Sequence, residues 1–182
     1  MEDIKISAMK ISAKIPDTDL REVEKFCNKF NITCKWFNRH HLVVYHQLFT
    51  YTFFKRCETG RLSWHDQHVN ITRVEPQNVE ESIEELAWLI DNKSDKIFHS
   101  IDNITASGRL CKKLDLIEFI KCNTHYQDFI DYNPERFTGL FVRGQYGKAI
   151  LFSNGKVVYV GCKDKTQLEK LHKLILELCA AI

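Results

Sequence analysis

The chain has 182 residues, 44% of them hydrophobic and 27% charged, a composition typical of a soluble globular protein. No apolar run has membrane-spanning length and no secretory signal opens the chain, so we expect no membrane association. Seven cysteines without a Cys-x-x-Cys pair predict buried thiols in a reducing intracellular compartment, rather than a disulfide framework.

The net charge of +2 is distributed unevenly along the chain. Residues 1–92 carry 12 Lys/Arg against 14 Asp/Glu, a net charge of −2, whereas residues 93–182 carry 14 against 10, a net charge of +4. A positive surface attracts nucleic acid, so the second half is the better candidate for binding it.

The first half begins with an alternating segment, residues 4–15, that predicts a strand. A helix capped by Asp17 or Thr18 is expected to run through Phe30, and its apolar stripe consists of Leu20, Val23, Phe26 and Phe30. Strand-like runs follow at residues 41–45, 49–54 and 69–74. Pro76 then precedes a helix with Val79, Ile83, Leu86 and Ile90 on one face.

The second half repeats this order after a polar joint at residues 91–95. Its predicted elements are a strand at 100–106, a helix at 114–122, strands at 140–143, 149–153 and 156–162, and a helix from about residue 165. The order β-α-β-β-β-α therefore occurs twice, which predicts an internal duplication.

A hairpin is expected near the C-terminus, where Asn154-Gly155 separates two apolar runs. Its strands are apolar on both faces. One face carries Ile150, Phe152, Val158 and Val160, and the other carries Leu151, Val157 and Tyr159. Helices can cover one of these faces, so the second must meet another layer or a partner.

Just upstream lies Asp131-Tyr-Asn-Pro-Glu-Arg-Phe-Thr-Gly-Leu-Phe-Val-Arg143. With the hairpin and the following Gly161-Cys-Lys163, this segment resembles the second repeat of the TATA-box-binding protein family. The resemblance covers roughly residues 97–182, and the loop between Arg143 and Ile150 is about two residues shorter than usual.

The resemblance implies an α+β fold, a saddle in which two pseudo-symmetric β-α-β-β-β-α repeats form one curved antiparallel sheet with helices on its convex face. The repeats would be residues 1–92 and 96–182. The first half departs from the family pattern because it lacks Tyr-x-Pro-x-x-Phe and has a long polar loop at residues 55–68.

The function implied by the resemblance is a transcription initiation factor that binds and bends double-stranded, A·T-rich promoter DNA through the minor groove. Phe137 and Phe152 match the phenylalanines that the family inserts between bases; the alternative is that they are core aromatics. Asn103 matches an asparagine that donates to base acceptors, or else is an ordinary strand-end residue. The remaining matches are the apolar groove positions Ile150 and Val158, the phosphate-contacting Arg143, and the phosphate neighbours Lys156 and Lys163, for which simple solvation is the alternative.

Two further positions depart from the family as a pair. Thr105 replaces a groove-facing valine and Val160 replaces a groove-facing threonine. The exchange either compensates, alters base preference or weakens DNA binding.

First-half matches are looser. Phe37 and Phe54 are 17 residues apart, the family separation of the two wedges, and Thr72 falls where the first-repeat threonine would stand. With so many phenylalanines nearby, this spacing also arises by chance. No counterpart of Asn103 is evident in residues 4–15.

The segment Tyr132–Arg136 matches the family stirrup that contacts transcription factor IIB. Glu135 keeps an acidic position, whereas Asn133 and Arg136 replace an acid and an apolar contact. The resemblance thus implies a IIB-like factor and RNA polymerase as partners. The expected location is the nucleus, or a viral replication compartment or virion if the protein is viral.

Enzymatic readings lack a motif, since no phosphate-binding glycine loop, nucleophile elbow or paired carboxylates are visible. His65, His68 and Cys57 suggest zinc, but a fourth ligand is missing and a polar loop is the simpler interpretation. We therefore expect no catalysis, cofactor or metal. The rival interpretation is a protein-interaction module with weak or lost DNA binding. A subdomain of a DNA-processing enzyme is a third, which we disfavour because the chain ends at its own terminal helix.

Overall fold

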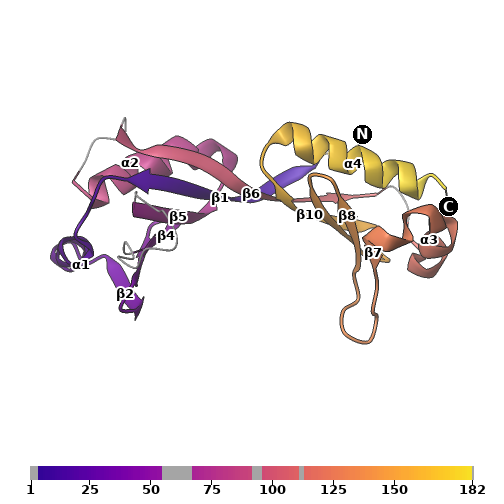
Figure 1. The fold of residues 1–182 in the computed structure, drawn as a ribbon, viewed down its shortest axis with the longest axis horizontal. Coiled ribbons are helices and arrows are strands. Elements are labelled where there is room, and N and C mark those ends of the chain that lie inside the picture. Colours follow the sequence, from indigo (N-terminus) through magenta and orange to yellow (C-terminus); the bar gives the residue numbers. More distant parts are fainter. Residues whose placement is uncertain (1–3, 55–66, 92–95, 111–112, 182) are drawn as a thin grey trace, which may run out of the picture. The chain divides into compact units, whose positions relative to one another are not determined.

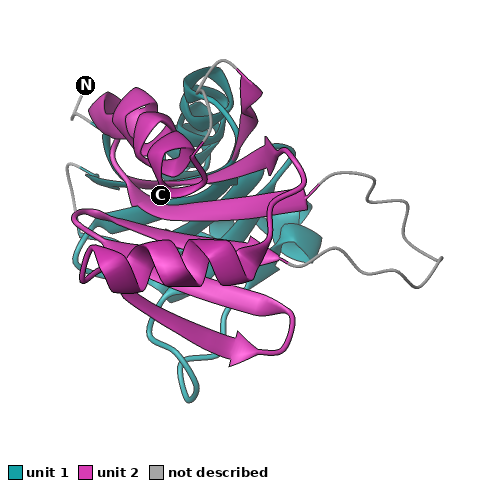
Figure 2. Ribbon diagram, turned by 90° about the vertical axis from the view of Figure 1, so that its left-hand side faces the viewer, with its two compact units in different colours: residues 1–7, 102–182 teal, residues 8–101 magenta. Residues whose placement is uncertain are grey.

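The computed structural model describes residues 4–54, 67–91, 96–110 and 113–181. Its strands form one ten-stranded sheet in the order β2-β3-β4-β5-β1-β6-β10-β9-β8-β7. Helices pack on this sheet, which confirms the predicted α+β class (Figure 1). The chain divides into two compact units, residues 1–7 with 102–182 (unit 1) and residues 8–101 (unit 2) (Figure 2).

These units are groups of residues in contact, whereas the predicted repeats are stretches of duplicated sequence. The first residues of strands β1 and β6 belong to the unit formed mainly by the other half of the chain. The repeat limits at 1–92 and 96–182 therefore stay a prediction.

Unit 2 contains two helices and most of five strands. The elements of this half are β1 (Lys5–Ile15), α1 (Leu20–Lys29), β2 (Thr33–Asn38), β3 (His41–His46), β4 (Phe49–Phe54), β5 (Gln67–Val74), the 3-10 turn η1 (Pro76–Asn78) and α2 (Val79–Leu89). Helix α1 packs against β2 and β3, and α2 packs against β5.

The helices and strands follow in the same order in unit 1, but its 3-10 segment comes after the first helix instead of before the last one. The elements of this half are β6 (Phe98–Arg109), α3 (Leu116–Cys122), the 3-10 segment η3 (Thr124–Phe129), β7 (Ile130–Asp131), β8 (Leu140–Gly144), β9 (Gly147–Leu151), β10 (Lys156–Cys162) and α4 (Lys165–Cys179). Helix α4 packs on β9 and β10.

The predicted element order is short by one strand in each half. Strand β2 was not predicted, because it pairs with β3 alone and its residues are mostly exposed, so its hydrophobic alternation is weak. Strand β7 has only two residues, too few for any periodic pattern. Strand β9 also ends at Leu151, before the predicted end at residue 153.

Acidic residues cap three of the helices. The cap of α1 is Asp19, which accepts a hydrogen bond from the Arg21 amide, and not Asp17 or Thr18 as the sequence suggested. The Thr18 hydroxyl instead donates to the Pro16 carbonyl, which removes it from the helix end.

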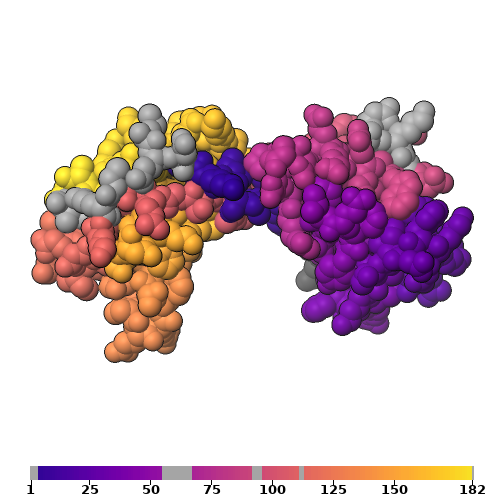
Figure 3. All heavy atoms as spheres, turned by 180° about the vertical axis from the view of Figure 1, so that it is seen from behind, coloured from indigo at the N-terminus to yellow at the C-terminus, as the bar shows by residue number. Residues whose placement is uncertain are grey.

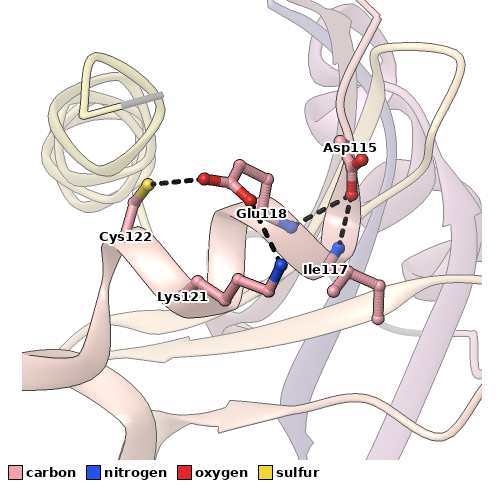
Figure 4. A network of polar contacts seen from close by, with 5 residues as sticks. All are labelled: Asp115, Ile117, Glu118, Lys121 and Cys122. Carbon is pink, nitrogen blue, oxygen red and sulfur yellow. Dashed lines mark hydrogen bonds and ion pairs between the residues drawn. The ribbon is translucent and has the colours of Figure 1, made fainter.

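In α3, Asp115 Oδ1 accepts from the amides of Ile117 and Glu118 at 2.9 and 3.0 Å (Figure 4). Glu118 reaches Lys121 Nζ at 3.5 Å and the Cys122 thiol at 3.6 Å along the exposed side of the same helix. The two bonds to Asp115 satisfy backbone amides that have no partner within the helix itself. They therefore stabilise the N-terminus of this short helix.

Alternation along the strands separates a buried face from an open one in each unit. In unit 1 the side chains of Leu151, Val157 and Tyr159 are fully buried on the face where α4 packs. Ile150, Phe152, Val158 and Val160 remain partly exposed on the other face. The predicted two-sided hairpin is thus confirmed.

The turn of this hairpin differs from the expected two-residue form. Phe152 and Lys156 are joined by a backbone hydrogen bond of 3.0 Å, so three residues form the loop. Only Gly155 has a positive φ, of 82°, and the Asn154 side chain accepts from the Lys156 amide. A three-residue loop that ends in a left-handed glycine is the next most common hairpin connection.

The cysteines that the structure describes carry free thiols. Three of them, Cys27, Cys162 and Cys179, are buried. Burial raises the pKa of the Cys27 thiol to about 12, which keeps it protonated and unreactive at neutral pH. Within the described ranges, every helix is too short or too polar to cross a membrane.

A buried polar pair joins α4 to the sheet in unit 1. The Tyr159 hydroxyl and His172 Nδ1 lie 2.5 Å apart, and their rings meet edge to face at 5.6 Å. Burial lowers the pKa of His172, because the charged imidazolium would lose its hydration. The folded protein therefore holds this histidine in its neutral form.

We predict that acidification destabilises the protein through His172. Because its pKa is lower folded than unfolded, its contribution to the free energy of unfolding is full above the unfolded value of about 6.5 and is lost as pH falls toward the folded value. Denaturant unfolding at pH 7 and pH 5 should show a smaller pH-dependent loss for His172→Gln than for wild type. The exposed His99→Gln is the control, and equal losses in wild type and His172→Gln would contradict the prediction.

Candidate nucleic-acid interface

The candidate interface is the open face of unit 1, the side of its strands that points away from α4. Its side chains line up in rows, because residues paired across antiparallel strands point to the same side. The middle row runs through β8, β9, β10 and β6 and consists of Phe141, Ile150, Val158 and Ser107. The resulting surface is mainly apolar and partly exposed.

The second row contains two cations, one of which, Lys148, is paired with Val160. It consists of Arg143, Lys148, Val160 and Thr105, again in register across the four strands. Lys148 Nζ lies 5.3 Å from the centre of the Phe141 ring, a cation–π contact that holds the ammonium over the apolar row. Arg143 is exposed at the end of β8.

An aromatic cluster closes one end of the open face. The Phe137 ring stacks on Phe141 at 5.3 Å and meets Phe152 edge to face at 5.9 Å. Phe137 is 41% exposed and Phe152 is partly exposed, so neither is a core aromatic. The sequence alternative of a core role is therefore wrong for both, while their DNA contact stays a prediction.

Gly139 makes the aromatic cluster possible. A Cβ at this position would lie 2.6 Å from Phe137 Cε1, 2.7 Å from Ile150 Cγ2 and 3.1 Å from Phe152 Cε1. Real Cβ contacts are longer than 3.0 Å, so any side chain here would push the rings apart. Glycine is required for the close approach of side chains, and its φ is not in the left-handed region.

Asn103 is fixed by a bulge in β10. Gly161 is an extra residue between Val160 and Cys162, with a φ of 96°, and its amide donates to Asn103 Oδ1 at 2.5 Å. An amide N–H can only donate, so the oxygen of Asn103 must face Gly161, and the Nδ2 end points away from it. Asn103 is therefore oriented by the strand, and its donor end is the one turned away from the bulge.

The remaining predicted contacts lie at the edges of this face. Lys156 is exposed at the start of β10, directly opposite Arg109. Lys163 is exposed after β10, and its amide donates to Gln167 Oε1 at the start of α4. Neither lysine has an arrangement that decides between phosphate contact and solvation.

The predicted partner-binding residues lie in the β7–β8 loop, residues 132–139, which projects beyond the strands (Figure 3). Its turn is built on the Asn133 carbonyl, which accepts from the amides of Arg136 and Phe137. Glu135 and Arg136 are exposed and Tyr132 is partly exposed. The loop is therefore accessible, and its partner stays a prediction.

Sequence reasoning missed three members of the open face, namely Phe141, Lys148 and Ser107. Phe141 and Lys148 follow the same alternation as Arg143 and Ile150, so the parity of β8 and β9 was the available signal. Ser107 could be placed only once the pairing of β6 with β10 was known.

Unit 2 has an open face in the same register, but its chemistry is polar. Strands β3 and β4 of unit 2 correspond to β8 and β9 of unit 1. The two ladders are aligned by matching the buried pair Leu42 and Phe53 with the buried pair Leu140 and Leu151. The unit 2 row that corresponds to the apolar row of unit 1 consists of Val43, Thr52, Asn70 and Ser12. Ser12 Oγ donates to Asn70 Oδ1 at 3.0 Å, so this row is tied together by hydrogen bonding.

The aromatic cluster has no close equivalent in unit 2. Phe54 stands at the position of Phe152, which supports the looser sequence match. His41, however, stands at the position of Gly139, and its ring meets the Phe54 ring at 4.7 Å. Phe37 is 79% exposed on β2, which connects to β3 by a short turn instead of a projecting loop.

The ladder also supplies the first-half counterpart that the sequence did not reveal. In the aligned ladders, the pair of Met9 and Val74 corresponds to the pair of Ile104 and Cys162. The residue before Met9 is Ala8 and the residue before Ile104 is Asn103, so Ala8 occupies the position of Asn103. Thr72 aligns with Val160, and Arg73, with a φ of 67°, aligns with Gly161. Unit 2 thus keeps the threonine hydroxyl but not the asparagine amide.

The suspected zinc residues can be placed only in part. Cys57 and His65 lie outside the described residues, as does most of the predicted polar loop at 55–68. His68 lies on β5 and pairs with Phe54 and Lys14. Among the described side chains, His, Cys, Asp and Glu form no group of three that could hold a metal ion.

In sequence, the known proteins that are similar to this chain match its second half. Residues 98–181 match the family model described as transcription factor TFIID (or TATA-binding protein, TBP). The TATA-box-binding protein of Thermococcus sibiricus is 34% identical over 84 residues, which cover 45% of this chain and 43% of that protein. This half of the chain is therefore similar to the TATA-binding protein family.

A second relative and a solved structure agree with this similarity. The TATA-box-binding protein of Thermococcus celer is 37% identical over 78 residues, 41% of this chain and 39% of that protein. Both matches therefore cover less than half of the curated relative. The solved structure of Methanococcus jannaschii TBP covers 99% of both chains with a TM-score of 0.77 and 23% identity, so the whole chain has the fold of the TATA-binding protein family.

We predict that Gly139→Ala destabilises the protein by about 1–3 kcal/mol, because the new methyl group would overlap the Phe137 and Ile150 side chains. Denaturant unfolding monitored by circular dichroism measures the change. Gly108→Ala is the matched control, since a Cβ there meets its nearest atom, Val157 Cγ1, at 3.6 Å. If both variants lose the same stability, crowding at Gly139 is not the cause.

Proposed function

We propose that this protein is a transcription initiation factor that binds and bends A·T-rich promoter DNA through the minor groove. The observation that carries the proposal is the apolar open face of unit 1, with its exposed aromatic cluster at one end and Arg143 and Lys148 in the neighbouring row. The match of residues 98–181 to the TATA-binding protein family supports the same class of function.

The chemistry of the open face suits the minor groove. The groove floor presents mainly acceptors in A·T pairs, and its width and bendability carry much of the selectivity. Phe137 and Phe152 are accessible rings that can enter between base pairs, at a cost of a few kcal/mol per unstacked step. Contact between the bent groove and the apolar row offsets that cost. Asn103 would donate to base acceptors, and the cations would contact phosphates.

The β7–β8 loop supports the recruitment of a protein partner. In this proposal it binds a IIB-like factor through Tyr132, Asn133, Glu135 and Arg136, and that factor positions RNA polymerase. Glu135 keeps the acidic position of the family pattern, but Asn133 and Arg136 depart from it, so the surface on the partner would differ as well.

The protein would act where transcription occurs, inside the cell and, where there is one, in the nucleus. The relatives come from Thermococcus and Methanococcus species, so they lend no support to a viral compartment. The TATA-binding protein family consists of transcription factors rather than enzymes, and we propose no catalytic role for this chain.

The second candidate function is a protein-interaction module in a transcription complex, with weak or lost DNA binding. The polar open face of unit 2 favours it, because Thr52 and Asn70 stand where unit 1 has Ile150 and Val158. Ala8 in place of an asparagine removes a base contact from the same unit.

We predict that Phe137→Ala and Phe152→Ala each weaken binding to an A·T-rich duplex by at least about tenfold and reduce its bending. Both side chains are partly exposed, so the fold should survive. Fluorescence anisotropy measures affinity, and energy transfer between dyes at the duplex ends measures bending. Leu176→Ala is the matched control, because Leu176 is 42% exposed on α4, away from the open face.

The same titrations at two salt concentrations test the cations. Arg143→Ala and Lys148→Ala should weaken A·T-rich and G·C-rich duplexes alike and flatten the dependence of affinity on salt. Wild-type affinity and bending in both phenylalanine variants would contradict DNA binding by the open face and favour the interaction module.

We further predict that Val160→Thr increases discrimination between A·T-rich and G·C-rich duplexes by about 1 kcal/mol, the value of one net hydrogen bond. Val160 lies on the open face between Lys148 and Thr105, so a hydroxyl there could donate to acceptors on the groove floor. Thr72→Val makes the opposite exchange at the aligned position of unit 2 and should lower discrimination. An unchanged affinity ratio in Val160→Thr would mean that Thr105 already supplies the hydroxyl.

A further inference from the structure

A second aromatic surface lies on the helical side of unit 2. The aromatic patch consists of Phe26 on α1, Phe30 at its C-cap, Trp88 on α2 and His46 at the end of β3. The Trp88 ring lies 4.8 Å from Phe26, 5.6 Å from Phe30 and 5.6 Å from His46, and the two phenylalanines are 4.7 Å apart. Trp88 is therefore the centre of a continuous surface.

The aromatic patch is not needed to fill the core of unit 2. Phe30 is 48% exposed and Trp88 is 43% exposed, while Val23, Cys27 and Leu86 occupy the buried sides of the same helices. Exposed contiguous aromatic groups are unfavourable in water unless they bind something, and tryptophan is the residue most enriched at binding hot spots.

Negative charge adjoins the aromatic patch. Helix α2 contains four glutamates and no lysine or arginine. Glu85 turns inward, with Oε1 3.0 Å from His46 Nδ1, but Glu84 is exposed one helical turn before Trp88, and Glu81 is exposed beside it.

Two of the three cationic residues of α1, Lys25 and Lys29, have contacts within unit 2. Lys29 Nζ lies 5.4 Å from the centre of the Phe30 ring, and Lys25 forms a 2.6 Å ion pair with Glu22. The negative charge beside Trp88 is that of the α2 carboxylates, because this helix has no cation of its own.

We propose that the aromatic patch docks a basic amphipathic helical segment of a partner protein. Apolar side chains at positions i and i+4 of such a helix are about 6 Å apart, which matches the separations of 4.8 and 5.6 Å between the rings. Lysine or arginine side chains beside these anchors would face Glu81 and Glu84. This mode of binding places an apolar helical stripe on an apolar surface and uses charge for orientation.

The inference is independent of the proposed DNA contact, because none of its residues lies on an open face. A partner bound here leaves the open face of unit 1 available. Binding at the aromatic patch can therefore be present or absent whatever the outcome of the DNA titrations.

Synthetic peptides test the proposal on the full chain. The probe is a peptide of about 18 residues, enough for five helical turns, with leucines at helical spacing and lysines beside them. Its charge-reversed control carries glutamates in place of the lysines. We expect the basic peptide to bind at least about tenfold more tightly by anisotropy, and to shift the Trp88 and Phe30 signals in NMR spectra.

Variants assign the binding to the aromatic patch. Trp88→Ala should weaken the basic peptide at least about tenfold. Glu84→Lys should weaken the basic peptide and strengthen the charge-reversed one, and as an exposed substitution it leaves the fold intact. Ile117→Ala, an exposed apolar change in unit 1, is the matched control and should have no effect.

Two results would overturn the proposal. One is equal binding of both peptides, or binding that Trp88→Ala and Glu84→Lys leave unchanged. The other is a concentration-dependent dimer, seen by sedimentation, that Trp88→Ala dissociates, because the occupant of the patch would then be a second copy of the chain.

Discussion

The packing of α4 on β9 and β10 is the constraint on which the open face of unit 1 depends. Side chains on a strand alternate, so burying Leu151, Val157 and Tyr159 on the helical side turns Ile150, Val158 and Val160 outward. A slip of one residue would exchange the two sets. The bond between Tyr159 and His172 penalises such a slip, because both partners are buried and each needs the other.

The two units share one strand pairing but differ in the side chains of their open faces. Their ladders agree in register, yet the central row is Phe, Ile, Val and Ser in unit 1 and Val, Thr, Asn and Ser in unit 2. Burying an apolar row against a ligand gains roughly 25 cal/mol per Å² of surface, whereas burying hydroxyls and amides gains nothing unless each finds a partner. The energetic weight of the proposed DNA contact therefore lies in unit 1.

The sequence predicted most strands and helices because their core faces are regular. It did not predict β2 and β7, whose few residues carry too little alternation, and it misplaced the cap of α1 among three neighbouring polar residues. For the candidate site, the hairpin parity placed Ile150, Phe152, Val158 and Val160 correctly. The roles of Lys148, Gly139 and Ala8 depend on pairing across strands, and a single sequence carries no information on register beyond its turns.

The two units have one backbone feature in common at a position where their side chains differ. Gly161 and Arg73 occupy the same bulge in two aligned ladders, both with positive φ, although an arginine adopts that conformation only at some cost. The surrounding strands must then impose the kink, and the residue that fills it is free to drift. A bulge at the same place in both ladders is what the predicted internal duplication would leave behind, even where the side chains of the two halves differ.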